Sequence, residues 1–226
     1  MSKTRLMTAV AIGAAGLVLS GCGSAAPGVA VEVGSQEIST SRVDAAARNM
    51  CTALGDQFEA EGTTVPMGFV RQGVVQLLTL RAQAEQIAKE YGVTPGSTYS
   101  NDVAQRERTA ASMPEDVRDD YVELTSANSL AQDILEQVGR IKLKEDGVAD
   151  PTVDQITQAG VDVFNVWPDA NGVEIDPRYG LENVDGVLTP VDTNLSVAVS
   201  QSAQDGLNEE PDVAYARTLP LTHRCG

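Results

Sequence analysis

Two spacings of apolar residues run along this chain, and they predict different secondary structures. Near the start, residues 29–33 alternate and are rich in valine, which predicts a short strand that turns at Gly34. Beyond it, apolar residues recur every three to four positions, for example at Val43, Ala47 and Met50, as in an amphipathic helix. The same spacing predicts helices over about residues 41–60, 66–91, 98–112, 114–146 and 151–159.

After Gly160 the spacing changes again. Residues 161–166 alternate, which predicts a strand, and residues 173–176 are expected to pair with it across a turn at residues 168–172. Residues 195–199 predict a further strand. The expected fold class is therefore mainly α within the α+β class: a helical body with a small sheet formed by strands from both ends of the chain.

The first residues have the pattern of an export signal. Lys3 and Arg5 precede an apolar run from Leu6 to Leu19, which is shorter than the roughly 20 residues needed to cross a bilayer. The residues Leu19-Ser20-Gly21-Cys22 resemble the lipobox of bacterial lipoproteins, in which the cysteine receives a lipid and becomes the first mature residue. We therefore expect the lipid on Cys22 to anchor the protein on the outer face of the cytoplasmic membrane.

These boundaries divide the chain into four expected parts. They are a lipoprotein signal peptide (1–21), a lipidated tether (22–28), a helical domain with its small sheet (29–199) and an acidic C-terminal tail (200–226). The tail has little periodicity, so we expect it to be mobile unless Cys225 fixes it in place.

Charge narrows the range of partners. The chain has 32 acidic and 16 basic side chains, with a formal charge of −16. Nucleic acid is not an expected partner, because binding phosphates requires a basic patch. Anionic lipid headgroups would also repel this surface, so the membrane contact is expected to come from the lipid on Cys22.

Two cysteines, Cys51 and Cys225, remain once Cys22 carries lipid. In an exported, oxidising compartment thiols tend to pair, so we predict a disulfide between them. The alternative is two unpaired thiols, one on a helix face and one in the tail.

Residue types that carry catalysis are scarce. His223 is the one histidine of the sequence and falls near its end, so a triad with a Ser or Cys nucleophile is not expected. The sequence has no Cys/His cluster for zinc and no glycine-rich phosphate loop, and acidic pairs such as Asp119-Asp120 and Glu209-Glu210 lack a calcium-loop pattern. The sequence leaves one catalytic alternative open, a pair of carboxylates that converge in space as in glycosidases. We expect no cofactor, no metal and no enzymatic activity.

The order of the elements resembles a known family. A strand at residues 29–33, Ile38-Ser39 leading into a helix, a second apolar helix, a long later helix and the segment Asp176-Pro177-Arg178-Tyr179-Gly180 are similar to the N-terminal chaperone domain of SurA-type periplasmic foldases, in the lipoprotein version of actinobacteria. The similarity spans roughly residues 29–190. It implies a domain that grips unfolded exported polypeptides on apolar surface between helices.

The chain departs from many members of that family, which insert a parvulin prolyl isomerase domain before the closing strand. Only a few tens of residues separate the predicted helix end near 146 from Pro177, so isomerase activity is not implied. Met67 and Phe69 are our hypothesis for a client groove, because Met and aromatic side chains suit promiscuous binding. Trp167 is interpreted as core, and residues 177–180 as a turn with an exposed Arg and a packed Tyr.

These patterns together predict a membrane-anchored extracytoplasmic lipoprotein whose chaperone-like domain binds unfolded or partly folded exported polypeptides. The alternative is a structural or interaction lipoprotein that binds one specific envelope partner or a small ligand. An envelope hydrolase has the least support.

Overall fold

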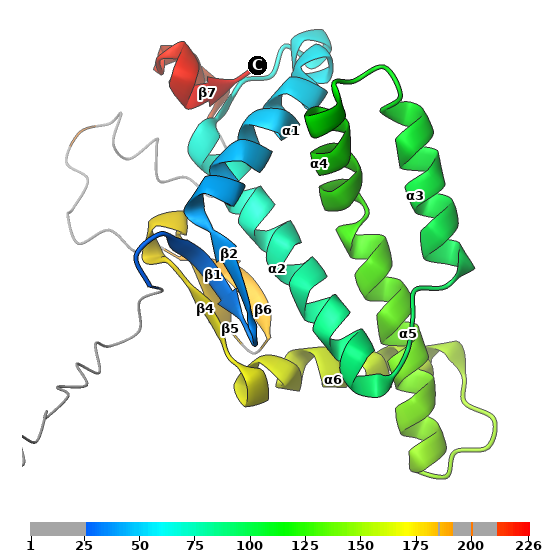
Figure 1. Ribbon diagram of the computed structural model, residues 1–226. Coiled ribbons are helices and arrows are strands. Elements are labelled where there is room, and N and C mark those ends of the chain that lie inside the picture. The colour runs from blue at the N-terminus through cyan, green and yellow to red at the C-terminus, as the bar shows by residue number, and fades with distance from the viewer. Residues whose placement is uncertain (1–25, 185, 192–199, 201–211) are drawn as a thin grey trace, which may run out of the picture.

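The computed structural model describes residues 26–184, 186–191, 200 and 212–226 (Figure 1). Its helices are α1 (Thr40–Glu61), α2 (Met67–Tyr91), α3 (Ser97–Thr109), α4 (Glu115–Thr125), α5 (Ala127–Glu145), α6 (Val153–Asn171) and α8 (Val213–Thr218), with 3-10 turns η1 (Pro177–Tyr179) and η2 (Leu221–His223). Its strands are β1 (Val29–Val33), β2 (Gln36–Ser39), β3 (Val65–Pro66), β4 (Val173–Ile175), β5 (Leu181–Val184), β6 (Val187–Pro190) and β7 (Arg224–Cys225).

The predicted fold class is confirmed: the molecule is mainly helical, with small antiparallel sheets. The sheet of three strands has the order β2-β1-β4, so strands from the two ends of the domain meet in it. β1 pairs with β4 in the register Val31 to Ile175 and Val33 to Val173. Figure 1 shows this sheet beside α2, with α3, α4 and α5 on the other side of that helix.

Local sequence explains the ends of the two longest helices. The Ser39 side chain accepts a hydrogen bond from the backbone N–H of Arg42, which caps α1, and Gly62 ends that helix in the left-handed conformation. α2 ends in the same way at Gly92, as the sequence predicted. Among the described residues, α2 contributes eight of the 28 buried residues of the central core, more than any other element.

Two glycines allow α5 and α6 to pack backbone to backbone. A Cβ atom on Gly139 of α5 would overlap the carbonyl oxygen of Ile156, and one on Gly160 of α6 would overlap the carbonyl oxygen of Leu135. The close approach therefore depends on the missing side chains. It also sets the position of α6 against α2, where the site described below lies.

The strand predicted at residues 161–166 is wrong, because this segment lies within α6. Thr152 and Gln155 form a capping box that starts the helix, and apolar residues such as Ile156, Val163 and Trp167 share its buried face. Alternation over six residues did not distinguish a strand from one side of a helix. β4 consequently pairs with β1 and not with residues 161–166.

Pro168 lies inside α6, where the sequence predicted a turn. A proline has no backbone N–H, so the carbonyl oxygen of Phe164 loses its usual partner within the helix. The side-chain amide of Gln83 on α2 donates to that oxygen at 2.7 Å. This long-range hydrogen bond explains why the helix continues past the proline.

The single helix predicted over residues 114–146 is also wrong, because α4 and α5 are separate helices that meet at Ser126. Thr125 and Ser126 donate their hydroxyl groups to the carbonyl oxygens of Tyr121 and Glu123 in the preceding turn. Such side-chain bonds compete with the backbone pattern and bend helices. The short helix expected to end at 159 extends instead to Asn171.

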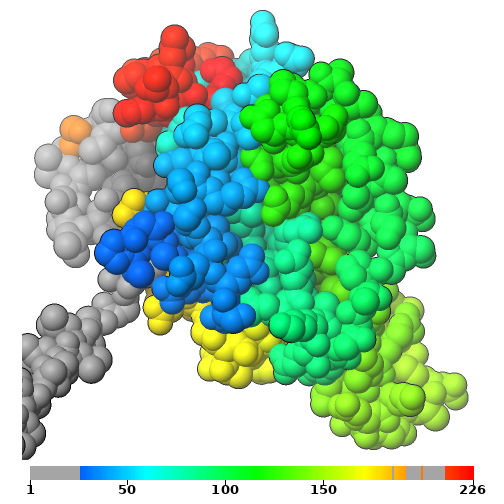
Figure 2. All heavy atoms as spheres, viewed as in Figure 1, coloured from blue at the N-terminus to red at the C-terminus, as the bar shows by residue number. Residues whose placement is uncertain are grey.

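The last part of the chain is folded, which is the outcome expected for a tail that Cys225 fixes in place. Residues 212–226 form α8, η2 and β7, and β7 pairs with β3 in the register Val65 to Cys225. Arg217 donates to the carbonyl oxygen of Gly62 at 2.7 Å. Figure 2 shows this segment, in red, packed on the surface formed by α1 and the start of α2.

Several expectations lie outside the described residues. They are the signal peptide (1–21), the lipid-bearing Cys22, the strand at 195–199 and residues 201–211 of the acidic tail. Within the described ranges, none of the helices combines the length and apolar character needed to cross a membrane.

Candidate functional site

An apolar pocket of about 300 Å³ lies between α2, α6 and the hairpin formed by β5 and β6. Leu135 of α5 and Val173 of β4 complete its wall. Its described lining residues are Gln76, Thr79, Leu80, Gln83, Leu135, Val161, Phe164, Asn165, Pro168, Val173, Asn183, Gly186, Val187 and Leu188. None of these lining residues is ionisable, so the described wall of the pocket is neutral.

The helical wall of the pocket follows from features already described. The capping box starts α6 in the register that turns Val161, Phe164 and Pro168 toward α2. The hydrogen bond from Gln83 to the Phe164 carbonyl then joins the two helices at the pocket. Since Gln83 is 6% exposed, little water competes for this bond.

The hairpin covers the pocket on the other side. Asn183 and Leu188 are opposite each other in the β5–β6 register, and both side chains line the pocket. At the turn, a Cβ on Gly186 would lie 2.5 Å from the Cα atom of Asn165, and the residue has a φ of 83°. A glycine is therefore needed for the turn to lie this close to α6. The hairpin was not predicted from the sequence.

Two residues that line the pocket each carry a buried polar atom without a hydrogen-bond partner. The hydroxyl of Thr79, a residue that is 2% exposed, and the side-chain oxygen of Asn183 are buried without a hydrogen bond. In the described part of the chain, the Nε of Arg224 is the one other buried side-chain atom of this kind. A buried polar group without a partner costs about 1–3 kcal/mol, so both in one apolar pocket indicate a place for a ligand group.

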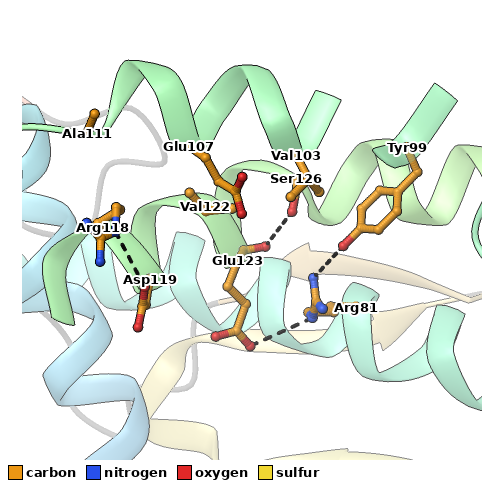
Figure 3. Close-up of a pocket in the computed structure, with 10 residues that line it drawn as sticks. All are labelled: Arg81, Tyr99, Val103, Glu107, Ala111, Arg118, Asp119, Val122, Glu123 and Ser126. Atoms are coloured by element: carbon orange, nitrogen blue, oxygen red, sulfur yellow. Dashed lines mark hydrogen bonds and ion pairs between the residues drawn. The ribbon is translucent and has the colours of Figure 1, made fainter. Parts of the chain in front are cut away.

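A second, polar cavity of about 570 Å³ lies between α2, α3 and α4 (Figure 3). Its described lining residues are Arg81, Tyr99, Val103, Glu107, Ala111, Arg118, Asp119, Val122, Glu123 and Ser126. Figure 3 shows Arg81 from α2 between Tyr99 and Glu123, which come from α3 and α4. We refer to this cavity as the polar cleft.

The charges at the centre of the polar cleft are paired. Arg81 donates to the Tyr99 hydroxyl at 3.3 Å and forms ion pairs with Glu85 and Glu123 at 2.9 and 3.8 Å. Burial lowers the pKa of Arg81, but the hydrogen bond to Tyr99 and the two carboxylates outweigh it, so its pKa is raised above the ordinary value. Arg81 therefore stays a fixed cation that joins three helices.

Arg42 of α1 extends this network. It contacts Asp120 and Glu123 at 2.6 Å each, and Asp120 also accepts from Asn49 at 2.7 Å. Asp119, the other member of the predicted acidic pair, lies 3.8 Å from Arg118. Because these groups satisfy one another, the polar cleft is explained as a structural network and the apolar pocket is the better candidate site.

The predicted disulfide between Cys51 and Cys225 is present. It joins α1 to β7, with the two Cα atoms 5.6 Å apart. Cys225 is 1% exposed and belongs to the core, which explains why the last residues are folded.

Met67 and Phe69 are not brought together with the apolar pocket. Met67 is 5% exposed and packs in the core at the start of α2, whereas Phe69 is 44% exposed. Neither residue lines the apolar pocket or the polar cleft. Their part in a client groove stays a prediction.

The remaining interpretations concern Trp167 and the segment after β4. Trp167 is buried and donates its ring N–H to Glu90 at 3.1 Å, so it packs as expected. Residues 177–179 form η1, in which Tyr179 is buried and Arg178 is exposed beside Asp176. Across the described ranges, no group of three or more His, Cys, Asp or Glu side chains could hold a metal ion.

Sequence reasoning missed the residues of the apolar pocket. Thr79 and Gln83 are polar residues four positions apart on the apolar side of α2, and this interruption of the stripe was a usable signal. Asn183 belongs to a hairpin that was not predicted, so nothing linked it to α2.

Comparisons with models of protein families, with curated proteins and with solved structures find no match to this chain.

Proposed function

We propose that this protein is a non-enzymatic binding lipoprotein of the outer face of the cytoplasmic membrane, and that the apolar pocket is its binding site. The observation that carries the proposal is a pocket with an apolar wall and two unpartnered polar atoms, Thr79 Oγ1 and Asn183 Oδ1. Ligand pockets have this composition: mostly apolar surface with a few polar groups that orient the ligand. The pocket therefore favours the alternative, stated from the sequence, of a lipoprotein that binds a small ligand.

The distribution of reactive groups supports a binding role over catalysis. His223 lines neither cavity, and the carboxylates around the centre of the polar cleft are engaged by Arg42 and Arg81. A general base has to reach a substrate, and paired carboxylates in a structural network are poorly suited to that task. The membrane location rests on the lipobox-like sequence before Cys22.

The direct test fills the pocket and leaves the fold unchanged. Leu188→Trp places a large ring in the pocket, and Thr189→Trp is the matched control, because Thr189 is the next residue on β6, exposed and outside the pocket. Both changes are made in the complete mature chain with Cys22→Ser, and a panel of small neutral compounds is screened by ligand-observed NMR.

The proposal requires that some compounds bind the unchanged protein and the control, and that Leu188→Trp abolishes their binding. It is wrong if the panel gives no binding to the unchanged protein, or if the filled pocket binds as well as the control.

A chaperone-like role is the second candidate, and one observation favours it. Val184 and Val187 flank the hairpin turn and are 46% and 58% exposed. The turn packs on Asn165, and the neighbouring Val166 is 61% exposed. Exposed apolar side chains beside an apolar pocket suit the binding of unfolded exported polypeptides, which the family resemblance implies.

This candidate is tested by the aggregation of a reduced or urea-diluted model protein. Suppression near an equimolar ratio, lost when both Val184 and Val187 are replaced by Ser, supports it. Unchanged aggregation argues against client binding and leaves the small-ligand role.

A further inference from the structure

The unpartnered atoms of the apolar pocket define the chemistry of its ligand. Resting on the proposed binding function, we infer that the pocket takes a small uncharged molecule with an apolar body and one hydroxyl group, such as a phenol or a short alcohol. The occupant is a free small molecule, and its hydroxyl meets Thr79 and Asn183.

The hydroxyl is required by what the two atoms can do. The Asn183 oxygen accepts hydrogen bonds, and the Thr79 hydroxyl can donate or accept. A ligand hydroxyl both donates and accepts, so it can serve either atom. One N–H of the Gln83 side chain donates to the Phe164 carbonyl, so the assignment of the ligand hydroxyl rests on Thr79 and Asn183.

The described lining has no ionisable group, which disfavours a charged ligand. A carboxylate or an ammonium group would enter an apolar wall formed by residues such as Leu80, Phe164 and Leu188 without a counter-ion. Moving an unpaired charge out of water into such a wall is far more costly than moving a neutral hydroxyl. The described lining therefore favours a neutral ligand.

The volume limits the apolar body. About 300 Å³ is twice the roughly 150 Å³ of an engineered cavity that binds benzene, so one substituted ring or a short alkyl chain fits. An extended polypeptide advances about 3.3 Å per residue and needs a longer groove with backbone partners. The described lining gives a compact pocket between α2, α5, α6, β4 and the β5–β6 hairpin, which favours a small molecule.

The expected preference of the pocket for a ligand hydroxyl over a methyl group has a physical reason. Thr79 and Asn183 both line the pocket, and their buried polar atoms have no partner before a ligand enters. A ligand with a methyl group beside them leaves these polar atoms unpaired, whereas a hydroxyl supplies a hydrogen bond. The preference is thus a property of these two side chains and not of the apolar wall.

The experiment compares three probes of the same shape: 4-ethylphenol, 4-ethyltoluene and 4-ethylbenzoate. Their affinities are measured by calorimetry for the complete mature chain with Cys22→Ser. We expect 4-ethylphenol to bind at least about fivefold more tightly than 4-ethyltoluene, and no binding of 4-ethylbenzoate. In Thr79→Val, which is nearly isosteric, and in Asn183→Leu, the preference for the phenol should fall toward equality.

Each contrary result has its own meaning. Equal affinity for the phenol and the toluene, or a preference that survives both substitutions, overturns the hydroxyl assignment and leaves the binding function standing. Failure of every probe and of the wider panel overturns the binding function itself. A tyrosine-containing hexapeptide that binds more tightly than 4-ethylphenol overturns the small-molecule occupant in favour of a polypeptide side chain.

Discussion

The apolar pocket and the polar cleft lie on either side of α2, and they differ in whether their polar groups have hydrogen-bond or ion-pair partners. In the polar cleft and beside it, Arg81 and Arg42 engage the Tyr99 hydroxyl and the carboxylates of Glu85, Asp120 and Glu123. In the apolar pocket, Thr79 and Asn183 keep unpartnered atoms although the amide side chains of Gln76, Gln83 and Asn165 also line it. The larger and more charged cavity is therefore the more self-sufficient one, and unsatisfied groups are a better guide to a binding site than size.

The largest expected effect on stability comes from removing the disulfide, which lines neither cavity. This change tests whether ligand binding depends on the cross-link. Replacing Cys51 and Cys225 by Ser removes a cross-link between residues 174 positions apart. The chain-entropy relation predicts a loss of about 5 kcal/mol in the free energy of unfolding, measured by urea denaturation. Ligand affinity of the fraction that stays folded should be unchanged, and selective loss of pocket binding would contradict this expectation.

The next effect is specific to the pocket side. Gly160→Val forces a side chain against the Leu135 carbonyl and should separate α6 from α5, at a cost of about 3 kcal/mol. Gly73→Ala on α2 is the control, because no neighbouring atom lies within 4 Å of the position that its Cβ would take, and the extra methyl should stabilise the helix by about 0.5–1 kcal/mol. Equal unfolding midpoints of the two variants would refute the close-packing argument.

On the cleft side, Arg42→Met leaves Asp120 and Glu123 without their main cation. Asp120 is 7% exposed, so we expect a loss of about 2 kcal/mol by urea denaturation. Arg178→Met removes an exposed ion pair with Asp176 and should cost less than about 1 kcal/mol. A similar loss in both variants would show that the cleft network is no stronger than a surface pair.

Removing one hydroxyl from the apolar pocket and one from the polar cleft compares the two regions directly through their effect on stability. Thr79→Val removes an unpartnered polar atom and should raise the free energy of unfolding by about 1 kcal/mol. Ser126→Ala in the polar cleft removes a donor to the Glu123 carbonyl, from a residue that is 1% exposed, and should lower it by about 1 kcal/mol. If both variants lose stability in thermal unfolding, the difference between the two cavities does not hold.

The smallest effect is the pH dependence. Asp102 on α3 accepts from Arg106 and Ser129 at 2.7 Å each. The hydrogen bond from Arg106 lowers the pKa of Asp102 below its ordinary value, burial opposes this, and Ser129 adds to the lowering. Since the folded-state pKa is the lower one, its stabilisation is present above about pH 4 and is lost as the pH falls through the folded-state pKa.

Asp102→Asn should remove that part of the pH dependence in acid denaturation curves. The affinity of a neutral ligand for the pocket should not change with pH between about 5 and 8, because the described lining has no titratable group. A pH-dependent affinity in that range would place an ionisable group at the ligand.

Much of the helical body could be predicted from local sequence. The ends of α1 and α2 follow from Ser39, Gly62 and Gly92, whose effects act within one or two turns. The disulfide could be predicted from the number of cysteines and the expected compartment. The errors arose where distant residues decide the local structure, as when Gln83 satisfies the carbonyl that Pro168 leaves unpaired.

The sequence by itself determined the mainly helical class, the caps and the pairing of Cys51 with Cys225, because periodicity, capping and cysteine number act through local or compositional chemistry. Only the tertiary structure decided the pocket. Thr79 and Asn183 are about a hundred residues apart, and they line the same pocket because Gly160 lets α6 approach α5 and Gly186 lets the hairpin lie on α6. No local pattern predicts that arrangement, because it is fixed by the packing of backbones that are distant in sequence.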